Sequence, residues 1–325
     1  SDIRDNVGYS PITRVKRKDG SFDLTPLIVG SQGTLGIISE MIMKNEFVSA
    51  HMAVAAVAFS SSETARDALD NLRKLEPAFL EYYDGALFEA AASEGKVYDF
   101  YKTACASGSV STVIMIGFDD FNERARSRKL KKVAKTLQNV EVTLVSANGE
   151  DAQEILAIRE VTAYSLRPAG KDLSAPPLFD GAYIPSERFD DFSSAVATLA
   201  AKHHVTLPLH GRILESVYST RPQLQFHKVG DKQKVFKLLD EYAKIVESCG
   251  GHLIGEGGEG RVKARFAYAP LDDDILEFFT AVKAIFDPFA ILNPGVKQTA
   301  EIRQLVSQLR TDYDTAQFAS YVPYS

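Results

Sequence analysis

Strand-like and helix-like hydrophobic patterns alternate along this sequence, and that alternation limits the fold more than any other feature. Apolar runs predict strands at 50–59, 78–83, 111–118, 140–147, 178–185 and 205–222, with a short one at 252–254. Apolar residues at helical spacing predict helices at 61–75, 84–95, 121–138, 151–166, 186–203, 231–251 and 300–310. Several strands alternate apolar with polar residues, as half-exposed antiparallel strands do. We therefore expect an α+β fold with an antiparallel sheet and helices on one face, rather than a doubly wound parallel sheet.

The composition excludes several classes of protein. The 325 residues carry a formal net charge of −6, with acidic and basic residues interspersed, so we expect no nucleic-acid partner. Cys105 and Cys249 have no metal-ligand or disulfide spacing, which favours a reducing compartment. The apolar runs are strand-sized, and the first residues do not resemble a signal peptide. We expect a cytoplasmic protein with no transmembrane segment, and the alternative is peripheral attachment to a membrane.

The glycine-rich stretch Gly255–Gly260, GEGGEG, matches the dinucleotide-binding pattern G-x-G-x-x-G. That pattern requires a helix after the glycines to hold the pyrophosphate, yet the sequence continues as RVKARFAYAP, which is not a helix start. Glu256 and Glu259 would also repel a phosphate. Two interpretations stay open: a turn with solvated glutamates, or a turn that brings Glu256 close to a ligand or metal.

The stretch Leu24–Lys44, LTPLIVGSQGTLGIISEMIMK, carries a second glycine-rich loop. It resembles the signature of the FAD-linked oxidases of the vanillyl-alcohol-oxidase (PCMH) type, in which a strand, a V-G-S-E-G-T-L-G-I turn and a strand lie against the flavin. Gln32 stands where the family usually has Glu. The glycines permit close backbone approach to a cofactor, although the glycines alone would also suit a hairpin without a ligand. The resemblance implies that FAD contacts Gly30, Ser31, Gly33, Thr34, Gly36 and Ile37.

Three further segments resemble the same family in the same order. Arg4–Ser10, RDNVGYS, resembles the segment upstream of the flavin loop, and Ile155–Leu166 resembles the cap-domain helix whose substrate-facing arginine falls on Arg159. Phe286–Gln298 resembles the closing F-D-P-x-x-I-L-N-P-G-K segment, which places Asn293 at the flavin. The resemblance implies three parts: a remnant of a PCMH-type FAD-binding domain (1–46), a ferredoxin-like cap domain that shapes the substrate site (47–287), and a segment returning to the flavin domain (288–325).

On this alignment GEGGEG occupies the place of the family's active-site G-E-H-G turn. D-lactate, glycolate and D-2-hydroxyglutarate dehydrogenases of this type use that Glu with two upstream histidines to hold a divalent metal, and the adjacent His takes the proton of the substrate hydroxyl. Glu256 is retained, but Gly257 stands at the position of the base. His210 falls on the first metal histidine and Val217 on the second. The metal set of His210 and Glu256 is thus incomplete, unless Glu215, His227, water or substrate completes it.

The strand that supplies a Lys and an Asp in the family reads PLFDGAYIP, with Phe179 and Gly181 near those positions. The polar groups that survive in place are Arg159, His210 and Glu256, which we predict to be the catalytic residues. Structural or solvated roles compete with catalysis for the remaining candidates, which are Arg167, Arg212, Arg221, Lys263 and Tyr183.

The resemblance implies the C-terminal part of an FAD-dependent oxidoreductase. It would oxidise a hydroxylated, anionic substrate, a 2-hydroxy acid such as D-lactate or glycolate, by hydride transfer to FAD, with Arg159 holding the anionic group. The electron acceptor is not specified by the sequence, and an alcohol or a sugar acid is an alternative substrate. The family's pyrophosphate-binding loop lies upstream of these 325 residues, so we expect the chain alone to hold FAD weakly or not at all. It would need the N-terminal half of the FAD-binding domain, in the same or a separate chain. The alternative is a catalytically degenerate cap module that binds a partner or completes a flavin site.

Overall fold

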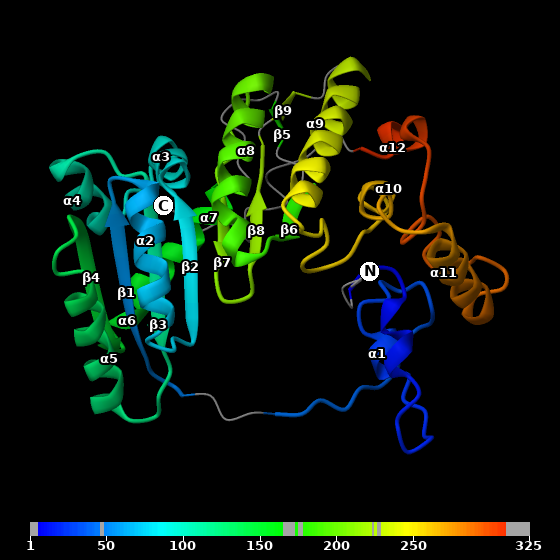
Figure 1. The fold of residues 1–325 in the computed structure, drawn as a ribbon, viewed down its shortest axis with the longest axis horizontal. Helices are drawn as coiled ribbons and strands as arrows, with labels where there is room; N and C mark the ends of the chain where they lie inside the picture. The colour runs from blue at the N-terminus through cyan, green and yellow to red at the C-terminus, as the bar shows by residue number, and fades with distance from the viewer. Residues whose placement is uncertain are drawn as a thin grey trace. The chain divides into compact units, whose positions relative to one another are not determined.

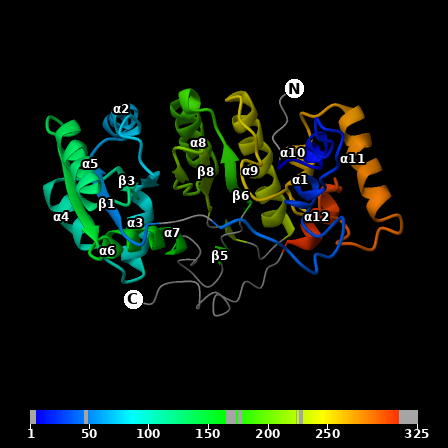
Figure 2. The same cartoon turned by 90° about the horizontal axis from the view of Figure 1, so that it is seen from below.

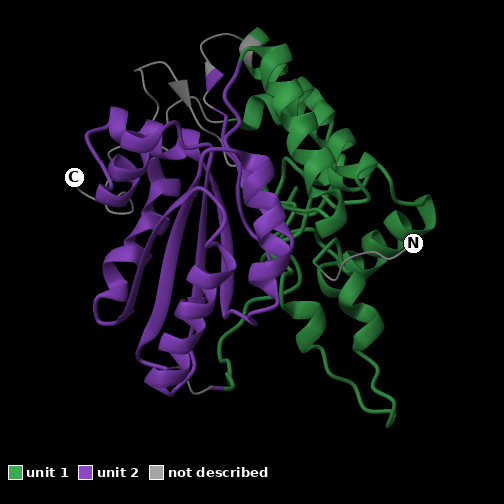
Figure 3. Cartoon of the chain, turned by 60° about the vertical axis from the view of Figure 1, so that its left-hand side comes forward, with its two compact units in different colours: residues 1–44, 177–204, 226–311 green, residues 45–176, 205–225, 312–325 purple. Residues whose placement is uncertain are grey.

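The computed structural model describes residues 6–45, 49–164, 173–174, 178–222, 224–225 and 229–309. The chain forms two compact units (Figure 3). Unit 1 comprises residues 1–44, 177–204 and 226–311, and unit 2 comprises residues 45–176, 205–225 and 312–325. This division cuts the chain at different places from the three domains expected from the sequence, and those domains stay a prediction.

Unit 2 is built on an antiparallel sheet, as the strand patterns predict. Its strands lie in the order β4-β1-β3-β2-β7-β8, and each neighbouring pair is antiparallel. Their bounds are Met52–Phe59 (β1), Phe79–Asp84 (β2), Thr112–Phe118 (β3), Val142–Gly149 (β4), His210–Arg212 (β7) and Val217–Thr220 (β8). The continuous pattern expected at 205–222 is therefore a hairpin, and Ser216 takes a left-handed φ of 57° before β8.

The first four strands have the connections of a ferredoxin-like fold. Helix α2 (Ser62–Arg73) joins β1 to β2, and α5 (Glu123–Thr136) joins β3 to β4. Each helix connects two parallel strands between which an antiparallel strand is inserted, and both helices lie on the same face of the sheet (Figure 1). The α+β class with a ferredoxin-like sheet is confirmed.

The opposite face of this sheet is also covered, whereas the sequence led us to expect helices on one face. The covering elements are α3 (Gly85–Ser93), α4 (Asp99–Ser107), α6 (Ala152–Leu156), η2 (Ala157–Glu160) and α7 (Val161–Tyr164). Figure 2 shows α2 on one side of β1 and β3, and α6 on the other. The reason lies in β1, whose residues Ala53 to Phe59 are apolar at every position and at most 3% exposed, so both faces have to be excluded from water.

Three expectations for local structure differ from the fold. The single helix expected at 151–166 is divided by a 3₁₀ turn, Ala157–Glu160, and residues 165–166 lie outside the described part. The strand expected at 252–254 is reduced to a bridge between Tyr183 and His252. The segment that resembles strand–turn–strand contains the short helix α1 (Thr25–Ile28), and residues 37–44 are not assigned to a strand.

Unit 1 contains most of the remaining helices. Strand β6 (Phe179–Tyr183) and the helices α8 (Phe189–His203) and α9 (Val229–Ser248) pack together, and Glu241 of α9 accepts hydrogen bonds from Lys202 and His203 of α8. The other elements are η1 (Ser10–Arg14), η3 (Ser186–Arg188), α10 (Ala264–Ala267), α11 (Asp273–Phe286) and α12 (Ile302–Gln308), and a two-stranded ladder pairs β5 (Leu173–Ser174) with β9 (Leu224–Gln225) in unit 2. None of the described helices is long and apolar enough to cross a membrane.

Candidate functional site

The loop with the flavin-oxidase signature forms a tight turn in unit 1 with its glycines outside. Gly30 and Gly33 have φ values of 82° and 71°, in the left-handed region that favours glycine. Gly36 is exposed, and no atom lies within 4 Å of an ideal Cβ at Gly30 or Gly36. Ile37 is 90% exposed. The outer side of this loop therefore offers accessible backbone and an apolar side chain, which fits the approach of a flat cofactor ring.

The hydroxyl groups of the same loop face inward. Thr34 is fully buried, its hydroxyl lies 2.7 Å from the Tyr9 hydroxyl, and it donates to the carbonyl oxygen of Ser31 at 2.7 Å. Ser31 is also buried. Of the residues predicted to contact FAD, Ser31 and Thr34 thus hold the loop together from within, which the sequence pattern could not distinguish from cofactor binding.

Gln32, which replaces the family's Glu, links the loop to two segments far away in the sequence. Its side-chain oxygen accepts a hydrogen bond from the Gly260 amide at 3.2 Å, and its carbonyl accepts one from Asn293 Nδ2 at 2.6 Å. A Cβ at Gly258 would lie 2.5 Å from the Gln32 side chain, so glycine is required there for this close packing. Asn293 in turn accepts from Arg261 Nη2 at 2.9 Å. The loop 30–36, the turn 255–260 and the segment 293–297 are thereby brought together within unit 1.

Buried charges join the turn 255–260 and the segment 293–297 to each other and to the backbone of Gly8. Lys297 Nζ lies 2.7 Å from Glu259 Oε2, and both side chains are at most 1% exposed. The other oxygen of Glu259 accepts from the Gly8 amide at 2.5 Å, and Lys297 also donates to the Gly8 carbonyl at 3.1 Å. Glu259 is therefore a buried ion-pair partner, and the sequence interpretation of solvated glutamates does not apply to it.

Lys283 of α11 makes a second such connection. Its ammonium donates to the Thr34 carbonyl at 2.7 Å, to Asp287 Oδ2 at 2.6 Å and to the Leu292 carbonyl at 2.8 Å, so all three of its protons are used. Asp287 also accepts from the amides of Ile291 and Leu292. The hydrogen bond from Lys283 is the main reason why the pKa of Asp287 lies below its usual range. The sequence analysis did not identify Lys283, because a lysine near the end of a helix is usually exposed.

Glu256 lies on a pocket of about 570 Å³ in unit 1, lined by Leu178, Asp180 and residues 256–263. Its amide and that of Gly255 both donate to the Gly181 carbonyl, at 3.0 and 2.6 Å. A Cβ at Gly181 would lie 2.5 Å from Glu256 Cγ. Gly181, which stands near the family's Asp, therefore leaves the space that the Glu256 side chain fills.

Gly257, at the place of the family's base, has a φ of 65° and no atom within 4 Å of an ideal Cβ. The position where a histidine side chain would begin is therefore open in this pocket. Lys263 lines the same pocket, is 9% exposed, and donates to the Asp180 carbonyl at 2.9 Å. Burial lowers the pKa of Lys263, while the charges of Asp180, Glu259 and Glu256 act in the opposite direction.

Arg159 and His210 belong to unit 2. The Arg159 guanidinium binds both oxygens of Glu81, with Nη2–Oε1 at 2.8 Å and Nε–Oε2 at 2.9 Å, and it lies 4.2 Å from the centre of the Phe79 ring. Tyr83 donates to the same carboxylate at 2.8 Å. Burial, followed by the Glu81 charge, raises the pKa of Tyr83. The predicted anion-binding arginine therefore already holds a carboxylate of the protein.

The strand register places His210 on the same face as this cluster. His210 of β7 lies directly opposite Tyr83 of β2, and directly opposite residues of antiparallel strands project to one face. Phe79, Glu81 and Tyr83 share that face because strand side chains alternate. Arg159 and His210 thus lie on the same face of the sheet of unit 2, whereas Glu256 and the loop 30–36 belong to unit 1.

Other predicted positions have mostly structural surroundings. Val217, at the place of the second metal histidine, is 4% exposed, and Phe179 packs edge-on against Tyr242. Arg212 and Glu215 lie 3.9 Å apart on the exposed β7–β8 hairpin. Arg167 and His227 lie outside the described residues. Within the described ranges, no group of three or more His, Cys, Asp or Glu side chains is arranged to hold a metal ion. The metal site stays a prediction.

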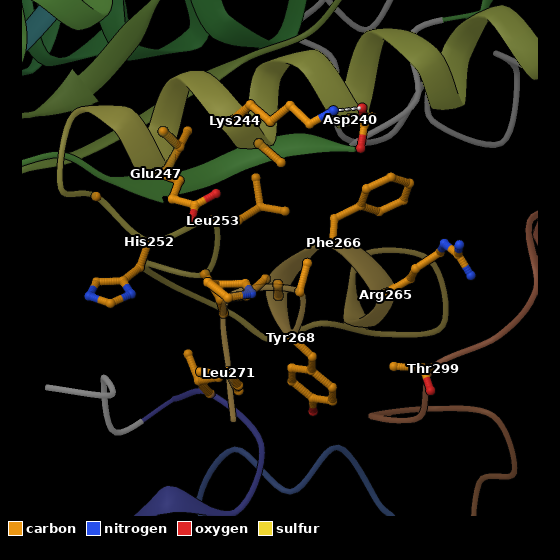
Figure 4. A pocket seen from close by; sticks show the side chains of 18 of the residues that line it. Asp240, Lys244, Glu247, His252, Leu253, Arg265, Phe266, Tyr268, Leu271 and Thr299 are labelled. Carbon is orange, nitrogen blue, oxygen red and sulfur yellow. Dashed lines mark hydrogen bonds and ion pairs between the residues drawn. The ribbon is translucent and has the colours of Figure 1, made fainter. Parts of the chain in front are cut away.

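A larger cavity in unit 1 is a separate feature. It measures about 1050 Å³ and lies among α9, residues 250–254 and residues 265–271 (Figure 4). Apolar side chains such as Leu253, Phe266 and Leu271 line it together with the Lys244–Asp240 ion pair. Its described lining includes none of the residues that we predict to be catalytic or to bind FAD.

Comparison with known proteins assigns the chain to a family. Residues 48–296 match the family described as FAD linked oxidases, C-terminal domain, and the chain belongs to this family. It is 25% identical over 289 residues to the glycolate oxidase subunit GlcD of Bacillus subtilis, covering 88% of this chain and 59% of that protein. It is 23% identical over 291 residues to D-lactate dehydrogenase of Archaeoglobus fulgidus, covering 89% and 60%. The chain thus spans about three fifths of the length of these two relatives.

Solved structures of the same type share the fold. A structure of p-cresol methylhydroxylase with bound substrate superposes with a TM-score of 0.56 at 10% identity, over 76% of this chain and 52% of that one. A structure of alkyldihydroxyacetonephosphate synthase superposes with a TM-score of 0.55 at 17% identity, over 84% of this chain and 50% of that one. The predicted relationship to the PCMH-type FAD-linked oxidases is confirmed.

Proposed function

We propose that this chain is the C-terminal part of an FAD-dependent oxidoreductase that oxidises a small anionic 2-hydroxy acid, such as D-lactate or glycolate. The observation that carries the proposal is the assembly of the loop 30–36, the turn 255–260 and the segment 293–297 through Gln32. Family membership and the relatives named as glycolate oxidase subunit and D-lactate dehydrogenase support the substrate class.

In this proposal unit 1 supplies one wall of the cofactor site. The exposed backbone at Gly30, Gly33 and Gly36, the Ile37 side chain and Asn293 would lie against FAD. FAD, when bound, supplies the acceptor for the hydride of the substrate α-carbon. The N-terminal half of the FAD-binding domain, in the same or another chain, would supply the rest of the site, so these 325 residues alone would bind FAD weakly or not at all.

The polar residues of the chain would position the substrate and handle its proton. Arg159 would hold the carboxylate. The two oxygens of Glu81 fix the guanidinium plane from one edge, and the arginine side chain is 42% exposed. With Gly257 at the place of the base, the imidazole of His210 is the group we propose to accept the hydroxyl proton. Glu256 packs against Gly181 and would be a catalytic residue in the pocket lined by residues 256–263.

The experiment is flavin reduction by a substrate panel. The chain is combined with the N-terminal half of the FAD domain, and bleaching of the flavin near 450 nm is followed on adding D-lactate, glycolate, D-2-hydroxyglutarate or neutral alcohols of the same size. Bleaching by the hydroxy acids, and its loss in Arg159→Met, is the expected result. Tight flavin in the 325-residue chain alone would contradict the partner proposal.

The open space at Gly257 favours a second candidate function. A protein without a base at this turn could keep the fold and act as a module that binds a partner or completes a flavin site. In that case no member of the panel bleaches the flavin, although the combined protein retains it. Flavin that is retained on co-expression with the other chain, but is bleached by no substrate, would identify a structural subunit.

A further inference from the structure

Helix α5 carries mostly basic side chains, although the net charge of the chain is negative. Its 14 residues Glu123–Thr136 include seven Arg and Lys and one acidic residue, in a chain of net charge −6. Five of the cations are exposed, and we call them the basic stripe: Arg124, Arg128, Lys131, Lys132 and Lys135. At about 100° per residue these five positions fall within roughly 100° of the helix circumference.

The opposite side of α5 is packed against unit 2. Arg126 and Val133 are buried there, and Arg126 donates to Asn148 of β4 and to the carbonyl of Asp120. Lys129, at the margin, pairs with Asp120 at 3.1 Å. The stripe is therefore the outward face of a helix that is fixed on the sheet, and Figure 1 shows α5 lying along that face of the sheet.

Within the part of the chain that the structure describes, none of the five stripe side chains has an ion-pair or hydrogen-bond partner. Their spacing also makes them repel one another, because residues three and four apart on a helix are neighbours and like charges there destabilise it. Helix α2, on the same face of the sheet, differs: its exposed charged residues are the acidic Glu63, Asp67 and Asp70, and Asp70 pairs with the half-buried Arg73 at 3.9 Å. A solvated helix face does not require the uncompensated repulsion found on α5, so the arrangement indicates an anionic partner.

We propose that the basic stripe is an electrostatic docking surface for a membrane that contains anionic phospholipids. The stripe spans 11 residue steps, about 17 Å along the helix, and presents all five cations to one side, so a flat anionic surface reaches them together. Phe121, 73% exposed at the start of α5, adds an apolar side chain that suits the headgroup region. A nucleic-acid duplex fits less well, because its surface is curved and offers no headgroup region for the exposed Phe121.

Binding of the basic stripe to such a membrane is electrostatic and reversible. Each cation near an anionic bilayer strengthens binding by roughly fivefold, and this attraction falls off within a Debye length. The inference does not depend on flavin chemistry, so it can fail while the proposed enzyme function holds, and the reverse is also true.

The test is co-sedimentation of the 325-residue chain with phosphatidylcholine vesicles containing about 30% phosphatidylserine. The stripe variant is Arg128→Glu/Lys131→Glu/Lys135→Glu. The matched control is Lys102→Glu/Lys234→Glu/Arg303→Glu, which makes the same change in net charge at exposed residues elsewhere. Glu has a helix propensity close to those of Arg and Lys, and circular dichroism checks that both variants fold.

We expect the unaltered chain and the control to bind these vesicles in about 0.05 M salt and to be released in about 0.5 M salt. The stripe variant should bind about a hundredfold more weakly, or more weakly still, since three cations are reversed. Absence of binding by the unaltered chain, equal loss in both variants, or equal binding to pure phosphatidylcholine would overturn the proposal. Stripe-dependent binding to duplex DNA without binding to vesicles would identify a nucleic-acid surface instead.

Discussion

Two regions of this protein are held together in different ways. In unit 2, Phe88 stacks on Tyr101 with ring centres 4.6 Å apart and meets Tyr98 and Phe100 edge-on, within a continuous apolar core between the sheet and its covering helices. In unit 1, the loops with the family's motifs are held by the buried Glu259–Lys297 pair and by Lys283.

The difference follows from what each region has to fix. Apolar packing is non-directional and scales with buried area, so it stabilises a sheet made of regular elements. Loops without regular hydrogen bonding have backbone groups that need individual partners, and charged side chains provide these with defined geometry. The stability of the motif loops of unit 1 therefore depends on a few charged hydrogen bonds, whereas the stability of the core of unit 2 depends on how completely apolar side chains fill its volume.

The largest effect is expected from opening the apolar core. Phe88→Ala removes a ring that is 1% exposed and contacts three other rings, and should lower the free energy of unfolding by about 4 kcal/mol. Urea unfolding followed by circular dichroism measures it. Phe88→Leu keeps most of the volume and should cost less than half as much. Equal losses for the two variants would show that volume is not what the core depends on.

The buried ion pair should respond to charge rather than to volume. Glu259→Gln leaves Lys297 charged and buried without its partner, and should cost about 3 kcal/mol. The double variant Glu259→Ile/Lys297→Met removes both charges and should recover most of that loss, because replacing a buried pair by apolar residues is often neutral. Losses that simply add in the double variant would contradict this.

A smaller effect is expected at Gly8, which binds the Glu259–Lys297 pair through its backbone and packs against the apolar ring of Phe279. A Cβ at Gly8 would lie 2.0 Å from the Phe279 ring, and Gly8 has a φ of 54°. Gly8→Ala should therefore cost about 2 kcal/mol through overpacking and backbone strain. Gly20→Ala is the control, since Gly20 has a φ of 85° and no atom within 4 Å of an ideal Cβ. If the two variants lose the same stability, the contact with Phe279 contributes nothing.

Much of unit 2 could be predicted from the sequence, because hydrophobic periodicity reports directly on regular elements. The strands at β1, β2, β3 and β4 and the helices α2 and α5 follow their patterns. The second helical layer was missed in part because α4, which belongs to it, was not recognised. The continuous apolar run of β1 nevertheless indicates burial on both faces.

The polar site could be predicted in position but not in its contacts. The resemblance identified Gln32, Asn293 and Glu256 as motif residues. The partners of Gln32 nevertheless lie more than 200 residues away, and Gly181, against which Glu256 packs, lies 75 residues away. Nothing local to Arg159 indicates that Glu81 binds it, and nothing local to Glu259 indicates Lys297. Such pairs are set by tertiary structure, which single-sequence patterns do not contain.

The smallest expected effect is a dependence on pH of the free energy of unfolding, which should be seen for the charged loops of unit 1 but not for the apolar core of unit 2. The pKa of Asp287 is lowered chiefly by the hydrogen bond from Lys283, so its ionised form stabilises the folded state. A lowered folded pKa gives a contribution that is complete above the unfolded value of about 4 and is lost as the pH falls through the folded value. The difference in free energy of unfolding between the unaltered chain and Asp287→Asn should therefore shrink as the pH falls below about 4.

The corresponding difference for Phe88→Ala should stay constant over the same pH range, because no ionisable group is removed. Parallel urea titrations of the three proteins at several pH values make this measurement. If the Asp287→Asn difference were also independent of pH, the Lys283–Asp287 bond would stabilise the loop no more than a neutral hydrogen bond does. The contrast between charge-held loops and an apolar core would then rest on the Glu259–Lys297 pair alone.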